Sequence, residues 1–267
     1  MPFIVKSDHQ RLSLDGKISL LNYENVSDKR VTLDQIKLVQ NQKFVLTSPM
    51  HGLSWFHVLK GSLKSVEETF DYSKMTMITS GFSLELLAIS ECELLIGTIE
   101  DATIYEKDFK EKTKSIISFD WTKEPVLKAE HDSRERIYLA TKGLLATEVI
   151  KGEMITYPKA ASGGAHHHEG AHHFQFVLKG EGVAVLEGKE FKLSAGDVLY
   201  NLENEVHYFY NVEDSDFVFI EYFIPGESKT VWQPDANVCG WIPKGVDSQG
   251  RKPARELSYH IHGQGDV

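Results

Sequence analysis

Five histidines and one glutamate stand within eight consecutive residues, HHHEGAHH, at positions 166–173. Imidazole nitrogens and carboxylate oxygens are groups that bind divalent transition metals in proteins. The tract has three interpretations: an accidental polyhistidine run, a loose metal-binding loop, or one wall of a built metal site. The flanking elements decide between them, because a strand holds alternate side chains on one face.

An apolar segment, FQFVLKGEGVAVLEG (174–188), follows the tract directly and has the composition of two strands. If residues 170–171 form a turn before it, the tract divides into two sets of side chains that face opposite ways. One set is His167, Glu169 and His173, and the other is His166, His168 and His172. A slip of one residue exchanges the sets, so alternation alone leaves the register open.

Short strands bounded by turn residues dominate the rest of the chain, and helical periodicity is scarce. Examples are SWFHVLKG, FSLELLAI and CELLIGTI in the first half, and EVHYFYNV and DFVFIEYFIP in the second. Many short strands at regular spacing indicate a sandwich, barrel or jelly roll. The predicted fold class is therefore all-β.

The two halves of the chain resemble each other. WFHVLKGSLKS (55–65) is similar to FQFVLKGEGVA (174–184), and an apolar strand follows each at a comparable distance. An offset close to half the chain indicates a duplicated domain rather than a short-period solenoid. We expect a first barrel at 1–105, a linker at 106–136, a second barrel at 137–225 and an irregular tail at 226–267.

The second half resembles the cupin family. The segment FVLKGEGVAVLEG matches the strand and turn of that family's first motif, and GDVLYNLENEVHYFYN (196–211) matches its second. Gly196, Asp197, His207 and Asn211 stand at motif positions, whereas the usual proline is absent. The resemblance implies a bicupin, which is a pair of double-stranded β-helix (jelly-roll) barrels, with a metal site in the second barrel.

Counting back from Val177, the family's carboxylate position falls on His173, and its paired histidine positions fall on His167 and Glu169. The resemblance therefore implies the ligand set His167, Glu169, His173 and His207. Three imidazoles and one carboxylate suit one divalent transition metal, Mn, Fe, Ni, Cu or Zn. An octahedral ion held by four side chains keeps two positions for water, dioxygen or substrate.

The first half lacks this chemistry. Its equivalent positions are Ser48, Met50 and Ser54, and no second motif follows. His51 and His57 are isolated, so the resemblance implies a degenerate first barrel.

Three further residues are candidates for contact with a substrate. Alternation with His173 turns Gln175 inward, where it can touch substrate or support a ligand. Tyr200 and Tyr208 flank the second motif, and each can donate a hydrogen bond. On the next apolar strand, only one of Glu221 and Tyr222 can face inward. His260 and His262, which are two residues apart in the tail, are expected at the surface or at an interface.

Composition excludes several classes of partner. With 29 Lys and Arg against 39 Asp and Glu, the formal net charge is -10, which is unsuited to nucleic acid or to an anionic membrane. There is no signal-like start and no span of about 20 apolar residues, and the two cysteines have no metal-binding spacing. We expect a cytoplasmic protein with a small-molecule substrate, and the family resemblance implies a homodimer.

Three functions remain open. The first is a mononuclear metal-dependent enzyme of dioxygenase type, which is an oxidoreductase acting on a small polar metabolite. The second is a metal-dependent aminohydrolase or isomerase, because the chain also partly resembles the bicupin ureidoglycine aminohydrolases. The third is a non-enzymatic cupin that binds a small ligand. An enzyme is preferred to a passive binder, because converging ionisable ligands destabilise a pocket unless a metal compensates them. Of the two enzyme classes, the dioxygenase type is preferred because of the set of three histidines and one glutamate.

Overall fold

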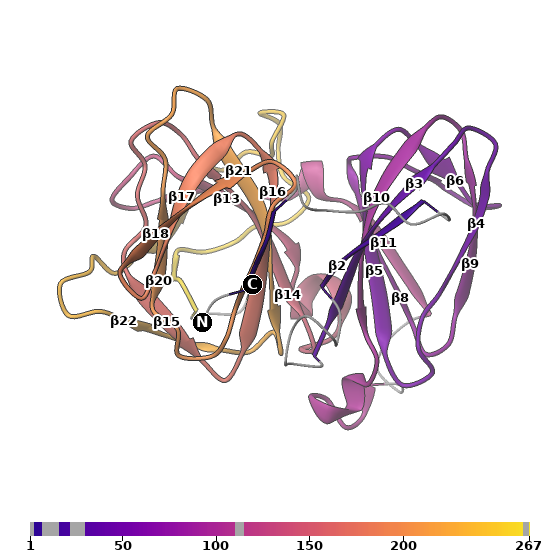
Figure 1. Ribbon diagram of the computed structural model, residues 1–267, viewed down its shortest axis with the longest axis horizontal. Helices are drawn as coiled ribbons and strands as arrows, with labels where there is room; N and C mark the ends of the chain where they lie inside the picture. Colours follow the sequence, from indigo (N-terminus) through magenta and orange to yellow (C-terminus); the bar gives the residue numbers. More distant parts are fainter. Residues whose placement is uncertain (1–2, 7–15, 22–29, 110–114, 264–266) are drawn as a thin grey trace. The chain divides into compact units, whose positions relative to one another are not determined.

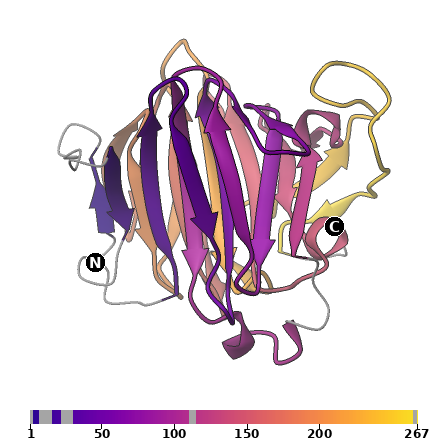
Figure 2. The ribbon, with the colours of Figure 1, turned by 90° about the vertical axis from the view of Figure 1, so that its right-hand side faces the viewer.

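The computed structural model describes residues 3–6, 16–21, 30–109, 115–263 and 267, and strands make up most of it (Figure 1 and Figure 2). The chain divides into two compact units. Unit 1 holds residues 1–9, 123–144 and 148–267, and unit 2 holds residues 10–122 and 145–147. Each unit consists of two antiparallel sheets, which confirms the expected all-β architecture of two barrels.

Unit 2 contains ten of the described strands. They are β2 (Lys17–Leu21), β3 (Thr32–Leu38), β4 (Lys43–Thr47), β5 (Leu53–Lys60), β6 (Leu63–Lys64), β7 (Thr69–Phe70), β8 (Lys74–Thr79), β9 (Ser83–Ala88), β10 (Cys92–Ile99) and β11 (Ile116–Asp120). One sheet has the order β11-β8-β5-β10-β3-β2, and the other has the order β4-β9-β6-β7.

Unit 1 contains the N-terminal strand and all strands after β11. They are β1 (Phe3–Val5), β12 (Leu127–Ala129), β13 (Glu135–Ala140), β14 (Lys151–Tyr157), β15 (His166–Glu169), β16 (His172–Lys179), β17 (Glu181–Leu186), β18 (Lys189–Ser194), β19 (Val198–Asn201), β20 (His207–Tyr210), β21 (Phe217–Ile224), β22 (Lys229–Trp232), β23 (Gly240–Pro243) and β24 (His260–Ile261). Their sheets have the orders β1-β19-β16-β21-β14-β13-β12-β23-β24 and β18-β17-β20-β15-β22.

The strand orders show the duplication that the sequence predicts. The run β11-β8-β5-β10-β3-β2 in unit 2 corresponds to β1-β19-β16-β21-β14-β13 in unit 1. The smaller sheets correspond in the same way, β4-β9-β6-β7 to β15-β20-β17-β18. Unit 1 then extends each sheet with further strands. These are β12 and the carboxyl-terminal strands β23 and β24 in one sheet, and the carboxyl-terminal strand β22 in the other.

The repeated VLKG sequence has a structural cause. Gly61 and Gly180 end the corresponding strands β5 and β16 with φ angles of 80° and 75°, a left-handed conformation that favours glycine. A Cβ atom at either position would lie 2.0 or 2.1 Å from the carbonyl oxygen of Glu91 or Asp216. Both the angle and the close backbone approach therefore require glycine at this turn.

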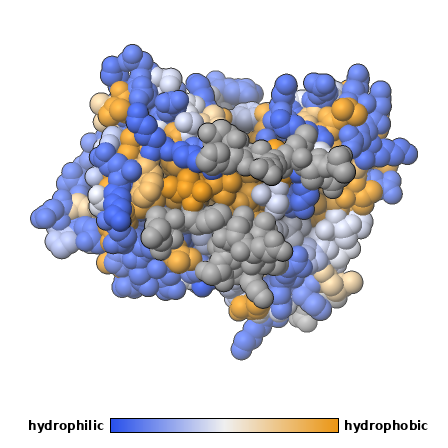
Figure 3. Space-filling model, viewed as in Figure 1, coloured by the Kyte–Doolittle hydropathy of each residue, from blue (hydrophilic) through white to orange (hydrophobic). Residues whose placement is uncertain are grey.

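Each barrel has its own apolar core. In unit 2, buried side chains such as Leu46, Phe56, Phe70 and Leu84 pack in one cluster. In unit 1, an apolar cluster built around Phe217 and Phe219 fills only part of the interior. Each large apolar side chain that is buried contributes about 1.5–3 kcal/mol to folding. At the surface, by contrast, hydrophilic side chains predominate and hydrophobic ones form patches, as one face of the molecule shows (Figure 3).

The helical elements whose residues are all described are single turns. These are η2 (Ala102–Ile104), η3 (Trp121–Lys123) and α2 (Lys142–Leu145). No helix among the described residues is long and apolar enough to cross a membrane.

Two stretches expected to be irregular contain paired strands. Residues 106–136 include β11, β12 and the start of β13, and residues 226–267 include β22, β23 and β24. Strand β22 pairs with β15, the histidine strand, while β23 pairs with β12. The tail is therefore built into the second barrel, because its short apolar segments find unpaired sheet edges there.

Candidate metal centre

Four histidines from three strands of unit 1 converge inside its barrel. His166 and His168 lie on β15, His173 on β16 and His207 on β20. The imidazole centroids are 4.5 Å apart for His166 and His207, 4.6 Å for His173 and His207, and 4.9 Å for both His166–His168 and His168–His173. We refer to these four residues as the histidine cluster.

The cluster contains two of the four ligands expected from the sequence, His173 and His207. On β15 the structure turns the other alternate set inward, so His166 and His168 take the places expected for His167 and Glu169. Glu169 lies at the surface, where its carboxylate accepts a hydrogen bond of 3.0 Å from Lys229. The register therefore differs by one residue from the expectation. The cause is the pairing of β15 with β20 and β22, in which His166 lies opposite His207 and Trp232.

Hydrogen bonds fix which imidazole nitrogens face the centre of the cluster. Nδ1 of His166 lies 2.8 Å from the carbonyl oxygen of Gly164, and Nδ1 of His207 lies 2.8 Å from that of Glu205. A carbonyl can only accept, so each Nδ1 carries its proton and each Nε2 keeps a free lone pair. Such outer hydrogen bonds orient metal-binding histidines in many proteins.

Burial keeps the cluster uncharged. Desolvation lowers the pKa of His207 from 6.5 to about 4, and it is also the main cause that lowers the pKa of His166, His168 and His173 well below 6.5. Mutual repulsion between the histidines acts in the same direction. Because a metal binds the neutral imidazole, this environment holds the four side chains in the form that coordinates.

Three members of the cluster meet the distance requirement for binding one divalent transition metal. One ligand nitrogen from each of His168, His173 and His207 lies within 4.8 Å of the others. Nε2 of His168 and Nδ1 of His173 are buried and have no hydrogen-bond partner in the structure. A buried polar atom without a partner destabilises the fold, whereas a metal ion would satisfy both atoms at once.

Aromatic side chains hold the imidazoles in place. Phe223 on β21 stacks on His173 with an interplanar angle of 11° and a centroid distance of 4.9 Å, and its edge meets His168 at 4.8 Å. Trp232 on β22 lies 5.0 Å from His166. These contacts restrict the ring rotamers, so little conformational entropy remains to be lost when a ligand binds.

A polar row lies next to the cluster on the larger sheet. Asn201 donates a hydrogen bond of 2.8 Å to Oε1 of Gln175 and lies 3.3 Å from Nε2 of His173. Gln175 is fully buried and faces inward, as alternation predicts. It lies directly opposite Glu221 on β21, which in turn lies opposite Glu153 on β14. Gln175 thus touches the cluster through Asn201.

Glu221 is the acidic residue of this row. Its Oε1 lies 3.9 Å from Nε2 of His173. Burial, and then the negative charge of Glu153, raise the pKa of Glu221 from 4.5 to about 8. Glu221 therefore carries a proton at neutral pH, and it is the inward-facing member of the pair Glu221 and Tyr222.

The structure places Tyr200 and Tyr208 away from the cluster. Tyr208 follows His207 on β20 and so points to the opposite face of that strand. Tyr200 precedes the inward Asn201 on β19, and its hydroxyl lies 3.3 Å from Nδ1 of His172, which is itself outside the cluster. Neither tyrosine is brought together with the four histidines.

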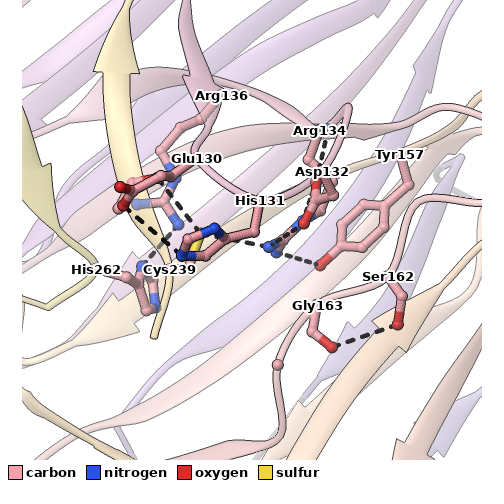
Figure 4. A network of polar contacts seen from close by, with 12 residues as sticks. Glu130, His131, Asp132, Arg134, Arg136, Tyr157, Ser162, Gly163, Cys239 and His262 are labelled. Atoms are coloured by element: carbon pink, nitrogen blue, oxygen red, sulfur yellow. Dashed lines mark hydrogen bonds and ion pairs between the residues drawn. The ribbon is translucent and has the colours of Figure 1, made fainter. Parts of the chain in front are cut away.

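A small pocket of about 20 Å³, partly open to solvent, lies beside the cluster and is lined by His166, His207 and Glu221. Its cationic lining residues are Arg134 and Arg136, which extend from the chain segment that includes β13 (Figure 4). Neither arginine belongs to a sequence motif of a metal site. Strand alternation places Arg136 on the inner face, but no short motif marks it.

Both arginines have a carboxylate partner. Arg134 binds Asp132 with 2.7 Å between Nη2 and Oδ2, and the buried Arg136 binds the buried Glu153 at 2.9 Å. Trp241 lies under the Arg136 guanidinium at 4.0 Å from the ring centroid. The charges of the two arginines are therefore balanced within the barrel.

The tail histidines are buried, which corrects the expectation that they lie at the surface or at an interface. Nε2 of His260 lies 2.6 Å from the Tyr138 hydroxyl, and Nδ1 of His262 lies 2.7 Å from Nη2 of Arg136. His262 also approaches the cluster, with its ring centroid 5.4 Å from that of His166. The contacts join positions over 120 residues apart, and only the tertiary structure reveals them.

Unit 2 has no comparable centre among its described residues, since both groups of possible metal ligands lie in unit 1. On the corresponding strand pair β4–β9 of unit 2, Leu46 lies opposite Leu84. Both leucines belong to the apolar core. His57 is buried, and desolvation lowers its pKa to about 4. The first barrel is thus degenerate, as the sequence predicts.

Fold and site together define a two-barrel β-protein with one histidine centre. Residues 153–223 match the family model described as Cupin domain. An oxalate-binding protein of Thermotoga maritima is 30% identical over 90 residues, which are 34% of this chain and 74% of that protein. The chain belongs to the cupin family.

Solved structures of oxalate decarboxylase from Bacillus subtilis share the two-barrel architecture. One, a deletion mutant, has a TM-score of 0.66 at 16% identity over 86% of this chain and 78% of that chain. Another, from work on the Mn(II) centres of that enzyme, has a TM-score of 0.66 at 14% identity over the same shares. At these identities the likeness shows the fold alone.

Proposed function

We propose that unit 1 holds a mononuclear metal centre that binds a small carboxylic acid of the oxalate class, and that the protein is an enzyme acting on this acid. His166, His168, His173 and His207 are the proposed metal ligands. This set replaces the one expected from the sequence, because the structure brings these four imidazoles together.

The main support for the proposal is the balance of charges in the site. Four neutral imidazoles do not compensate a divalent cation, and in the metal-free site burial and Glu153 raise the pKa of Glu221 and so favour its uncharged form. Asp132 and Glu153 already balance the two arginines of the pocket. A divalent metal would therefore introduce an unbalanced charge into a buried pocket, where the attraction for a small anion is strong. The oxalate-binding relative supports the same class of ligand.

The chain's own residues have distinct proposed roles. Phe223 and Trp232 restrict the imidazoles, while Asn201 and Gln175 hold His173 in position. Glu221 lines the pocket and carries a proton that it can donate to a bound ligand. A metal of this class, when bound, supplies positive charge and open positions for a carboxylate and, if it is redox-active, electron transfer.

Two reaction classes fit this arrangement. The first is a dioxygenase-type oxidation, in which O₂ supplies the oxygen atoms added to the substrate. The second is decarboxylation, which the protonated Glu221 favours. In that reaction the bond between the carboxyl carbon and its neighbour breaks, CO₂ leaves, and a proton replaces it on the remaining carbon. For oxalate the balance is one dianion and one proton giving formate and CO₂.

The first test is elemental analysis of protein purified without a histidine tag, followed by calorimetric titration with oxalate. We expect about one Mn, Fe, Ni, Cu or Zn per chain, and oxalate binding that a chelator abolishes. Acetate is the matched control, because it has one carboxylate and no second group to chelate. Oxalate binding that persists in metal-free protein would contradict the proposal.

Turnover assays in air and under nitrogen then separate the two reaction classes. An oxygenase consumes O₂ and stops under nitrogen, whereas release of CO₂ and formate without net O₂ consumption indicates a decarboxylase. Metal-dependent oxalate binding without any turnover would show a binding protein instead of an enzyme.

A further inference from the structure

The carboxyl-terminal strand β24 brings a fifth histidine next to the cluster. Possible ligand nitrogens of His166, His168 and His262 lie within 4.8 Å of one another, which by distance alone makes a second three-histidine group. His262 is buried, and it lines the same pocket as His166 and His207. Whether His262 binds the metal or the ligand depends on which of its nitrogens carries the proton.

Arg136 determines this tautomer. Nη2 of Arg136 forms a hydrogen bond of 2.7 Å with Nδ1 of His262 (Figure 4). The same nitrogen lies 2.9 Å from Oε1 of Glu153 in an ion pair. A guanidinium has no lone pair to accept with and does not lose its proton in proteins. Nδ1 of His262 must therefore accept, and the proton of the neutral ring must lie on Nε2.

The same geometry excludes the other protonation states of His262. An imidazolium would present an N–H group to the guanidinium N–H, which is repulsive. A metal bound at Nε2 would need an imidazolate, because Nδ1 already accepts from Arg136. This contrasts with His166 and His207, whose Nδ1 atoms donate to carbonyl oxygens and leave Nε2 with a lone pair.

We propose that His262 is not a metal ligand but a fixed hydrogen-bond donor, whose Nε2–H group binds the anion held at the centre. The contact with Arg136 uses Nδ1 alone, so the Nε2–H group of His262 is left for the anion. The arginines are less suited to this role, because both already bind carboxylates. The inference rests on the proposed metal centre and adds a specificity residue from the tail.

Neighbouring contacts hold the donor in place. His262 donates its backbone N–H to the carbonyl oxygen of Cys239, and its ring lies 6.2 Å from that of Trp232. Two residues earlier, on β24, His260 is held by the Tyr138 hydroxyl but does not line the pocket. His260 is therefore a matched control for changes in the packing of β24.

The test uses the full-length protein loaded with Co²⁺, whose visible spectrum reports changes in ligation. Azide, formate and oxalate are titrated against the wild type and the variants His262→Gln, His262→Asn and His260→Gln. In glutamine the amide nitrogen can take the place of Nε2, whereas the shorter asparagine cannot reach it. Co²⁺ affinity is measured separately by competition with a chelator.

We expect equal Co²⁺ affinity in all four proteins. His262→Asn should weaken anion binding about 10- to 100-fold, which corresponds to one hydrogen bond to a charged group. His262→Gln and His260→Gln should stay within a few-fold of the wild type. Loss of Co²⁺ from the His262 variants would overturn the inference, because it would make His262 a ligand. Unchanged anion affinity in His262→Asn would overturn it as well.

The three anions separate failure of the inference from failure of the proposed function. If azide and formate bind and depend on residue 262 but oxalate does not bind, the inference stands and the proposed substrate class is wrong. If no anion binds to the Co²⁺ protein, both are overturned.

Discussion

His166 lies directly opposite His207 on the antiparallel pair β15–β20, and their imidazole centroids are 4.5 Å apart. This cross-strand pair sets which face of β15 looks into the barrel, because residues alternate along each strand. His168 follows His166 on the same face, whereas His167 points to the other. Of the three consecutive histidines, His166 and His168 are therefore proposed ligands, and His167 is excluded.

The first prediction concerns this register. His168→Ala should remove most of the bound metal, and so should His207→Ala, since each deletes one proposed ligand. His167→Ala is the matched control, and its metal content should stay near that of the wild type. Elemental analysis of the untagged proteins checks this. Retention in His168→Ala with loss in His167→Ala would show that the register expected from the sequence holds.

The second prediction concerns the stability of the metal-free protein at acid pH. His207 has a pKa of about 4 when folded, against an ordinary value of 6.5, so the unfolded chain binds more protons between these values. The free energy of unfolding therefore decreases as the pH falls from 6.5 towards 4, by about 3 kcal/mol from His207 alone. Hydrogen exchange of unit 1 in a chelator at several pH values measures this loss.

His207→Leu should flatten that dependence, because it removes one of the groups that must stay neutral. His57→Leu is the control, since the pKa of His57 is lowered to about 4 in unit 2 and should affect that unit alone. A pH dependence of unit 1 that is unchanged in His207→Leu would contradict the prediction.

The third prediction concerns Glu221, whose pKa is raised to about 8 by burial and by Glu153. If Glu221 donates a proton, kcat should decrease as the pH rises through about 8, because the carboxylate form cannot donate. Glu221→Gln should lower kcat and abolish this part of the pH profile. The infrared band of a protonated carboxyl group, lost in the variant, tests the protonation directly. Its absence from the wild type at pH 7 would remove the basis for this role.

The fourth prediction compares two glycines with the same backbone angle. Gly180 and Gly188 both have a φ of 75°, but a Cβ at Gly180 would lie 2.1 Å from the Asp216 carbonyl oxygen, whereas Gly188 has nothing within 4 Å. Gly188→Ala should cost about 1–2 kcal/mol, which is the left-handed strain alone. Gly180→Ala should cost clearly more. Urea unfolding of both variants measures the difference, and equal losses would mean that the backbone at Gly180 relaxes freely.

The sequence by itself determined the strand-rich fold, the duplication and the type of site. Alternating apolar residues specify strands locally, and a glycine such as Gly61 or Gly180 marks a turn that few other residues tolerate. The motif GD followed by His207 lies close to its own strand, so His207 could be identified without knowledge of distant contacts. His173 and Gln175 were found for the same reason, since they share the strand of the VLKG turn.

Only the tertiary structure decided the register of β15 and the wall of the pocket opposite the motifs. Side chains of β15 alternate between two faces, and the turn after β15 does not determine which face points into the barrel. Pairing with β20 and β22 selects that face. Arg136 and His262 are 126 positions apart, and neither lies in a motif. Their contact forms only when the folded barrel brings the segments around β13 and β24 together. A contact between positions so far apart leaves no periodic signal in the sequence.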